Sequence, residues 1–266
     1  MIKLFATDLD GTLLDHDGHI ADEDVAALRR AREMGVTVVI ATGRMPTIID
    51  PILERLEVQP HEPVVGAQGS MITRRNGELL HSLTLAEELV HTAAAIAREF
   101  DAVPVFYTAT DILMERMAFS VEEDAFWLGD ALRYDPNALD NISGELIKML
   151  AVHPDPTAID ALLPAMQTAM GQQADVVRSH HWFVEAVNRR ANKGAAIAWI
   201  AERLGIRQHE VLAIGDAGND VSMLRWAGHS AAPANAAPDA RAVADWLAPT
   251  LQEHAVAATL AHFLKI

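Results

Sequence analysis

Short apolar runs alternate with amphipathic segments along the first 80 residues of the chain. The runs at 2–6, 36–41 and 63–67 are mostly apolar, with Lys3 as their one charged residue, which predicts buried strands. Between the first two runs, residues 22–34 repeat apolar positions at helical spacing and stop before Gly35, as a helix with a C-terminal glycine does. This alternation predicts the α/β fold class, with a Rossmann-like, doubly wound and mostly parallel sheet.

The pattern changes after the third predicted strand. Asn76-Gly77 separates two short apolar runs, which predicts a tight hairpin. The spacing of Thr84 and Glu87 predicts a capping box that opens a helix to about Phe100. Further runs predict strands at 103–108, 146–153, 174–178 and 182–187 and a helix led by Pro156, whereas 121–141 gives no clear pattern.

The α/β rhythm resumes at Lys193 with a helix, followed by a strand at 211–214. We therefore predict two domains. A discontinuous core comprises residues 1–83 and 188–266, and an inserted α+β module comprises residues 84–187.

Composition narrows the classes of partner. The 266 residues are 50% hydrophobic, and 37 acidic against 21 basic residues give a net charge of −16. Such a chain lacks the broad cationic surface that nucleic acid requires, so no nucleic-acid partner is expected. No apolar run is long enough to cross a membrane, and the absence of cysteine excludes disulfides and thiol catalysis. Because Met1 leads directly into a predicted strand without a leader pattern, we expect a cytoplasmic protein. We also expect a monomer or a weak homodimer.

Chemically active side chains follow the predicted strands or open a helix. Because the carboxyl ends of parallel strands meet at one edge of a sheet, we expect these side chains to gather there. The set comprises Asp8, Asp10, Thr42, Gly43, Arg44, Lys193, Asp216, Asn219 and Asp220.

Each residue type has a role in phosphoryl transfer. Asp8 is ionised near neutral pH, since the reference pKa of aspartate is about 3.9, and it can attack phosphorus without a separate base. Asp8 and Asp216 offer the hard oxygen ligands that Mg²⁺ prefers, and Lys193 adds positive charge opposite them. Asp10 can protonate a leaving group.

Thr42 and the backbone amides after it can donate hydrogen bonds to phosphoryl oxygens, and Gly43 allows a close approach. Arg44 is a candidate for a second anion of the substrate. A zinc site at His180-His181 is not expected, because neighbouring residues of a strand face opposite ways.

The strings DLDGT at 8–12, TGR at 42–44 and GDAGND at 215–220, together with Lys193, resemble the four motifs of the haloacid dehalogenase superfamily. More narrowly, they resemble those of the Cof-type sugar-phosphate phosphatases. The resemblance implies Asp8 as nucleophile and Asp10 as general acid and base, with its main-chain carbonyl on the metal. The metal implied is Mg²⁺.

The same resemblance implies that Asp216 binds the metal and that Asp220 supports it. It places Thr42, Lys193 and Asn219 on the phosphoryl group. The inserted module then corresponds to a cap of the IIB (C2B) type, which would close over the substrate and exclude water.

Two places depart from the family pattern. Gln68-Gly69 stands where an Asn-Gly pair is common, so Gln68 is a further candidate for a substrate contact. The string Gln252-Glu253-His254-Ala255 stands where the family usually carries an acidic residue before glycine.

These observations predict a Mg²⁺-dependent phosphatase for small phosphomonoesters, with sugar phosphates as the expected class and an aspartyl-phosphate intermediate. A phosphomutase with the same first step is an alternative. A signalling phospho-acceptor is another, although such a module needs neither this length nor a lid. The resemblance implies that dehalogenase chemistry would not use Asp10, and a transport ATPase would need membrane spans.

Overall fold

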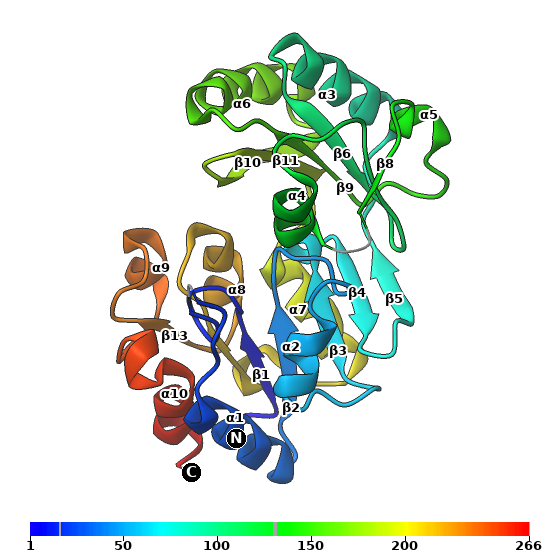
Figure 1. Cartoon of the computed structure of the whole chain (residues 1–266). Coiled ribbons are helices and arrows are strands. Elements are labelled where there is room, and N and C mark those ends of the chain that lie inside the picture. Colours follow the sequence, from blue (N-terminus) through cyan, green and yellow to red (C-terminus); the bar gives the residue numbers. More distant parts are fainter. Residues whose placement is uncertain (16, 130–131, 266) are drawn as a thin grey trace. The chain divides into compact units, whose positions relative to one another are not determined.

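The chain divides into two compact units, residues 1–81 with 192–266 and residues 82–191. The computed structural model describes residues 1–15, 17–129 and 132–265 (Figure 1). No helix among these residues is both long enough and apolar enough to cross a membrane.

A sheet of eight strands forms the centre of the first unit. The strands are β1 (Leu4–Thr7), β2 (Thr37–Ala41), β3 (Pro63–Gly66), β4 (Met71–Arg74), β5 (Leu79–Ser82), β12 (Val211–Ile214), β13 (His229–Pro233) and β14 (Trp246–Ala248). Their order is β14-β13-β12-β1-β2-β3-β4-β5, with β1 in parallel pairing to both β2 and β12. The chain reverses after β3, since β4 pairs with it antiparallel.

Helices cover both faces of this sheet. They are α1 (Asp22–Glu33), α2 (Asp50–Arg55), α7 (Lys193–Arg203), α8 (Val221–Trp226), α9 (Pro238–Val243) and α10 (Ala255–Leu264), with short 3₁₀ turns η1 (Ala67–Gly69), η2 (Gln208–Glu210), η3 (Gly218–Asp220) and η4 (Leu251–Glu253). Phe5 packs in one core with residues of α1 and α10, and its neighbour Leu4 packs in another with α7 and α8. Adjacent strand residues thus serve opposite cores, as alternation along a strand requires.

The second unit has a six-stranded sheet of mainly antiparallel strands. Its strands are β6 (Val103–Tyr107), β7 (Ile112–Met114), β8 (Leu132–Tyr134), β9 (Lys148–Val152), β10 (Ala174–His180) and β11 (Phe183–Asn188), and its helices are α3 (Glu87–Glu99), α4 (Val121–Leu128), α5 (Ala138–Asn141) and α6 (Pro156–Met170). The strand order is β10-β11-β9-β6-β7-β8, and α3 and α6 pack on one face through Phe106, Met149 and Val184. The segment that gave no clear pattern contains α4, β8 and α5.

The predicted capping box at Thr84 is wrong. The helix is present, but α3 begins at Glu87 after Ala86, and no side chain caps it. The reason is tertiary: the Leu85 N–H donates to the carbonyl of Leu146 at 2.8 Å, which holds the chain extended where a cap would have to turn. A capping box does occur at Ser120, at the start of α4.

Candidate active site

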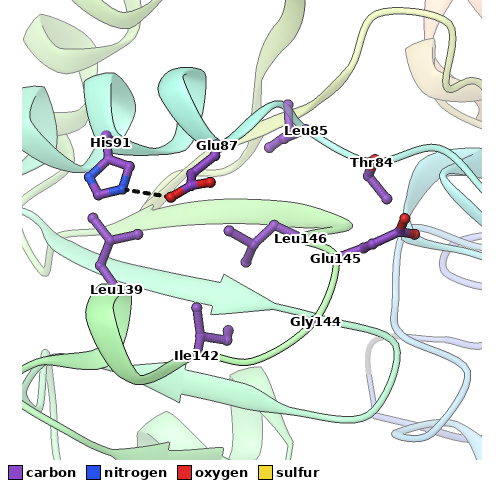
Figure 2. Close-up of a pocket in the computed structure, with 9 residues that line it drawn as sticks. All are labelled: Thr84, Leu85, Glu87, His91, Leu139, Ile142, Gly144, Glu145 and Leu146. Carbon is purple, nitrogen blue, oxygen red and sulfur yellow. Dashed lines mark ion pairs between the residues drawn. The ribbon is translucent and has the colours of Figure 1, made fainter.

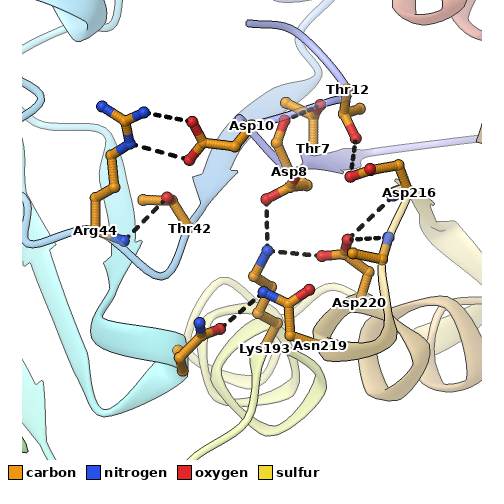
Figure 3. A network of polar contacts seen from close by, with 12 residues as sticks. Thr7, Asp8, Asp10, Thr12, Thr42, Arg44, Lys193, Asp216, Asn219 and Asp220 are labelled. Carbon is orange, nitrogen blue, oxygen red and sulfur yellow. Dashed lines mark hydrogen bonds and ion pairs between the residues drawn. The ribbon is translucent and has the colours of Figure 1, made fainter. Parts of the chain in front are cut away.

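The candidate residues gather at the carboxyl edge of the first unit's sheet, as expected. Asp8 follows β1, Thr42 follows β2 and Asp216 follows β12, and these three strands are neighbours in parallel pairing. Lys193 is the first residue of α7, whose N-terminus is capped by the Asn192 side chain. Figure 3 shows the polar network that results.

Lys193 lies at the centre of this network. Its side chain is fully buried, and its Nζ contacts Asp8 Oδ1 at 2.5 Å and Asp220 Oδ1 at 2.6 Å. Asp8 itself is only 4% exposed. Such short, charge-assisted bonds in a desolvated setting fix the Asp8 carboxylate in one orientation.

The loop after β12 is folded around Asp220. Its Oδ2 accepts hydrogen bonds from the backbone N–H groups of Asp216 at 3.1 Å and Ala217 at 3.0 Å. A Cβ at Gly215 would lie 2.5 Å from the Asp220 Cβ, so only glycine fits there. Asp220 therefore holds both the loop and Lys193 in place.

Asp216 faces the loop after β1. Thr12 Oγ1 donates to its Oδ1 at 3.2 Å. Gly11 has φ +83°, and a Cβ there would lie 2.5 Å from Asp216 Oδ2. Gly11 and Thr12 were not among the predicted site residues, although their place in the DLDGT string was a signal that could have identified them.

Negative charge exceeds positive charge in this cluster. Carboxylate oxygens of Asp8, Asp216 and Asp220 lie within 4.8 Å of one another. Burial, then repulsion from Asp220, raises the pKa of Asp8 well above its usual value and also raises that of Asp216. Burial by itself would lower the pKa of Lys193, but the attraction of Asp220 and Asp8 outweighs it and raises that pKa. A further cation would relieve the excess, and this hard oxygen donor set fits Mg²⁺.

Asp10 has a different partner from Asp8. Its exposed carboxylate accepts a two-pronged contact from Arg44, with Nε to Oδ2 at 3.0 Å and Nη2 to Oδ1 at 2.5 Å. β1 ends at Thr7, so Asp10 lies beyond the regular alternation of this strand. Buried Thr42 supports this side of the site, since its Oγ1 accepts the Arg44 N–H at 3.1 Å.

Gln68, Gly43 and Asn219 form a third group. Asn219 Nδ2 donates to Gln68 Oε1 at 3.0 Å. A Cβ at Gly43 would collide with the Gln68 carboxamide, so glycine is required for this close approach. The structure thus brings together the residues that follow β2, β3 and β12.

A surface cavity of about 310 Å³ lies in the second unit, and its lining includes none of the predicted site residues (Figure 2). Its lining comprises Thr84, Leu85, Glu87, His91, Leu139, Ile142, Gly144, Glu145 and Leu146. Two glutamates give it negative character, and His91 Nε2 faces Glu87 Oε1 at 3.7 Å. Such a lining is unsuited to a phosphate ester.

Comparison with known proteins gives the same assignment over nearly the whole chain. Residues 5–260 match the family model described as haloacid dehalogenase-like hydrolase. The chain is 28% identical over 264 residues to the 5-amino-6-(5-phospho-D-ribitylamino)uracil phosphatase YcsE of Bacillus subtilis strain 168, covering 99% of this chain and 96% of that protein.

Solved structures of other proteins share the fold of this chain. A haloacid dehalogenase-like hydrolase from Bacteroides thetaiotaomicron has a TM-score of 0.89 at 27% identity, covering 98% of this chain and 99% of that one. A subclass IIB sugar phosphatase shares the fold, with a TM-score of 0.81 at 23% identity, covering 99% of this chain and 100% of that one. The family resemblance, the fold class and the enzyme class predicted from the sequence are confirmed.

Proposed function

The chain belongs to the haloacid dehalogenase-like hydrolases, and from that premise we propose that it is a Mg²⁺-dependent phosphatase acting through an aspartyl-phosphate. The observation that carries the proposal is the buried Asp8 carboxylate, held by Lys193 beside two further carboxylates. A carboxylate fixed in this way can act as a nucleophile without a separate base.

We assign the metal to Asp8 and Asp216, with the main-chain carbonyl of Asp10 as a third protein ligand. Both oxygens of Asp220 are engaged, one by Lys193 and the other by backbone N–H groups, which suits a supporting role. A bound Mg²⁺ would supply the positive charge that lets an anionic phosphate approach an anionic nucleophile.

Donors from three elements would hold the phosphoryl group. Lys193 supplies positive charge and Asn219 an amide. The hydroxyl of Thr42 accepts from Arg44 and keeps its own proton to donate. Gly43 leaves room for the phosphoryl oxygens.

In the first step an oxygen of Asp8 forms a bond to phosphorus while the ester P–O bond breaks. Asp10 gives a proton to the leaving oxygen, so an alcohol departs and not an alkoxide. In the second step water attacks the phosphorus, Asp10 takes its proton, and inorganic phosphate leaves with Asp8 regenerated. The Arg44 guanidinium contacts both oxygens of Asp10, so it lies beside the group that makes these transfers.

The domain division follows the same proposal. Residues 1–83 and 188–266 are assigned as catalytic core and residues 84–187 as a cap that selects the substrate. Sugar phosphates are the proposed substrate class, and the shared fold with a IIB sugar phosphatase supports this choice. Arg44 and Gln68 are the core residues proposed to lie nearest the leaving group.

Turnover of p-nitrophenyl phosphate tests the proposal. The phosphatase is expected to release phosphate steadily with Mg²⁺ and to stop with EDTA. Release limited to one equivalent per chain would instead indicate a phospho-acceptor. Transfer of the phosphoryl group to an added sugar phosphate in preference to water would indicate a phosphomutase.

A further inference from the structure

Two adjacent residues after β3 adopt a backbone conformation that residues with a side chain rarely take. Ala67 has φ +48° and Gln68 has φ +59°. A left-handed conformation of this kind is unfavourable for an L-residue, because its Cβ lies too close to the backbone. Something in the surrounding structure must therefore hold both residues in place.

Helix termination does not account for this pair. Of the other described left-handed residues, Glu57, Asp101 and Lys265 lie at the C-terminal ends of α2, α3 and α10, where such a residue commonly ends a helix. Ala67 and Gln68 instead follow a strand. Strain of this kind, without a cap to explain it, is characteristic of functional segments.

Contacts on two sides hold the strained turn. The Ala67 N–H donates to the Arg44 carbonyl at 3.0 Å, and the Gln68 N–H donates to the Thr42 carbonyl at 3.3 Å. On the other side, a Cβ at Gly69 would collide with the backbone of Asn192, just before α7. The turn therefore lies between the segment 42–44 and Asn192, and it brings the Gln68 side chain into the candidate site.

The side chain of Gln68 reaches Asn219. Its Oε1 accepts from Asn219 Nδ2 at 3.0 Å, while the carboxamide packs over Gly43. Asn219 is exposed and lies in the short turn η3. An amide nitrogen carries two N–H groups, so one bond to Gln68 leaves the second for a ligand.

We propose that Gln68 is a positioning residue that orients the Asn219 amide toward the phosphoryl group. The inference rests on the proposed function, in which Asn219 binds that group. The left-handed backbone accompanies the placement of the long Gln68 side chain beside Asn219. An asparagine at this position would be one methylene shorter than Gln68.

Replacement of Gln68 by glycine separates positioning from a purely structural role. Gln68→Gly relieves the left-handed strain and removes the amide, so Tm is expected to stay equal or rise. At the same time kcat/KM for p-nitrophenyl phosphate is expected to fall about tenfold, the size of one lost hydrogen bond, mainly through KM. The inhibition constant of inorganic phosphate should rise by a similar factor. Gln68→Asn is expected to fold normally and to lose activity too.

His254→Gly is the matched control, because His254 also has a positive φ, +64°, but lies at the start of α10. It should gain stability without a change in kcat/KM.

Combining Gln68→Gly with Asn219→Ala provides the decisive measurement. If Gln68 acts through Asn219, the double variant loses no more than Asn219→Ala alone.

Additive losses, or a Gln68→Gly variant that loses Tm and keeps its kcat/KM, would overturn the inference while leaving the proposed function standing. Wild-type protein without Mg²⁺-dependent turnover would overturn the proposed function, and the inference with it. The two failures are therefore distinguishable in one set of assays.

Discussion

Among the described residues, each unit of the molecule has one buried lysine, and the two lysines differ in their surroundings. Lys193 in the first unit contacts two carboxylates, Asp8 and Asp220, with Asp216 close by. Lys148 in the second unit contacts Glu185 at 3.2 Å and lies 4.8 Å from the ring centre of Tyr107. All three of these ion pairs are almost fully removed from solvent.

The difference lies in the charge balance. The Lys148–Glu185 pair brings one positive and one negative charge together, as a structural ion pair does. Three carboxylates around one ammonium leave an excess of negative charge, which is unfavourable in a buried place unless a cation joins it. Burial of a charged residue is therefore a poor guide to function, whereas an unbalanced buried cluster is a good one.

The largest expected effect comes from Asp8→Asn. The replacement is nearly isosteric and keeps an acceptor for Lys193, but it removes the nucleophile. We expect turnover of p-nitrophenyl phosphate to fall by at least about 10⁴-fold, as with other covalent nucleophiles. The Tm should not fall, because one of three repelling charges is lost. Substantial residual turnover in a folded variant would contradict the mechanism.

Lys193→Met should damage both activity and stability. Asp8 and Asp220 would remain buried without their ammonium, which costs about 3–5 kcal/mol of unfolding free energy. The loss of charge next to the phosphoryl group should lower kcat by about 10²- to 10³-fold. Urea unfolding and steady-state kinetics measure the two effects. Adding Asp8→Asn is expected to recover part of the stability and none of the activity.

Lys148→Met tests the ion pair of the second unit, in which one positive charge meets one negative charge. It leaves Glu185 unpaired among buried residues and should also cost about 3–5 kcal/mol. The double variant Lys148→Met/Glu185→Leu is expected to regain most of that loss, because both charges are gone. If the double variant folds well but discriminates differently among sugar phosphates, the pair takes part in substrate recognition and the comparison needs revision.

The smallest expected effect concerns Asp24, a buried carboxylate outside the two lysine clusters. Burial raises its pKa to about 6, against a hydrogen bond from the Ala257 N–H and the field of His254. A folded-state pKa above the unfolded value means that the stabilising contribution is complete below about pH 4 and is lost as the pH rises through 6.

Asp24→Asn should therefore match the wild type at pH 4 and be more stable at pH 8 by about 2 kcal/mol. The asparagine oxygen can still accept from Ala257. Urea midpoints at several pH values measure the difference. A difference that stays constant from pH 4 to 8 would show that Asp24 does not titrate in this range.

Local sequence patterns were sufficient to predict much of the fold of this molecule. The parallel strands are apolar runs, and the candidate residues gather because they follow directly after such strands. Partners from distant segments were harder to foresee. Nothing near Asp10 in the sequence indicates that Arg44 takes both of its oxygens, and nothing near Gln68 indicates its bond to Asn219.

The segment 121–141 was undetermined for a similar reason. Its short elements depend on contacts made by Asp124, a fully buried carboxylate. Asp124 accepts from the backbone of Ala118 at 3.1 Å and from the Tyr134 hydroxyl at 2.9 Å. No periodicity encodes such a network, because one polar residue holds it together from inside.

The place of β1 between β2 and β12 has a consequence for biosynthesis. β2 belongs to the N-terminal part of the chain, whereas β12 and Lys193 lie in the C-terminal part, 185 positions beyond Asp8 in the case of the lysine. During translation, the second unit emerges completely before either of them. Asp8 cannot meet Lys193 until the whole second unit has been synthesised, so premature termination anywhere before Lys193 leaves the proposed nucleophile without its ammonium.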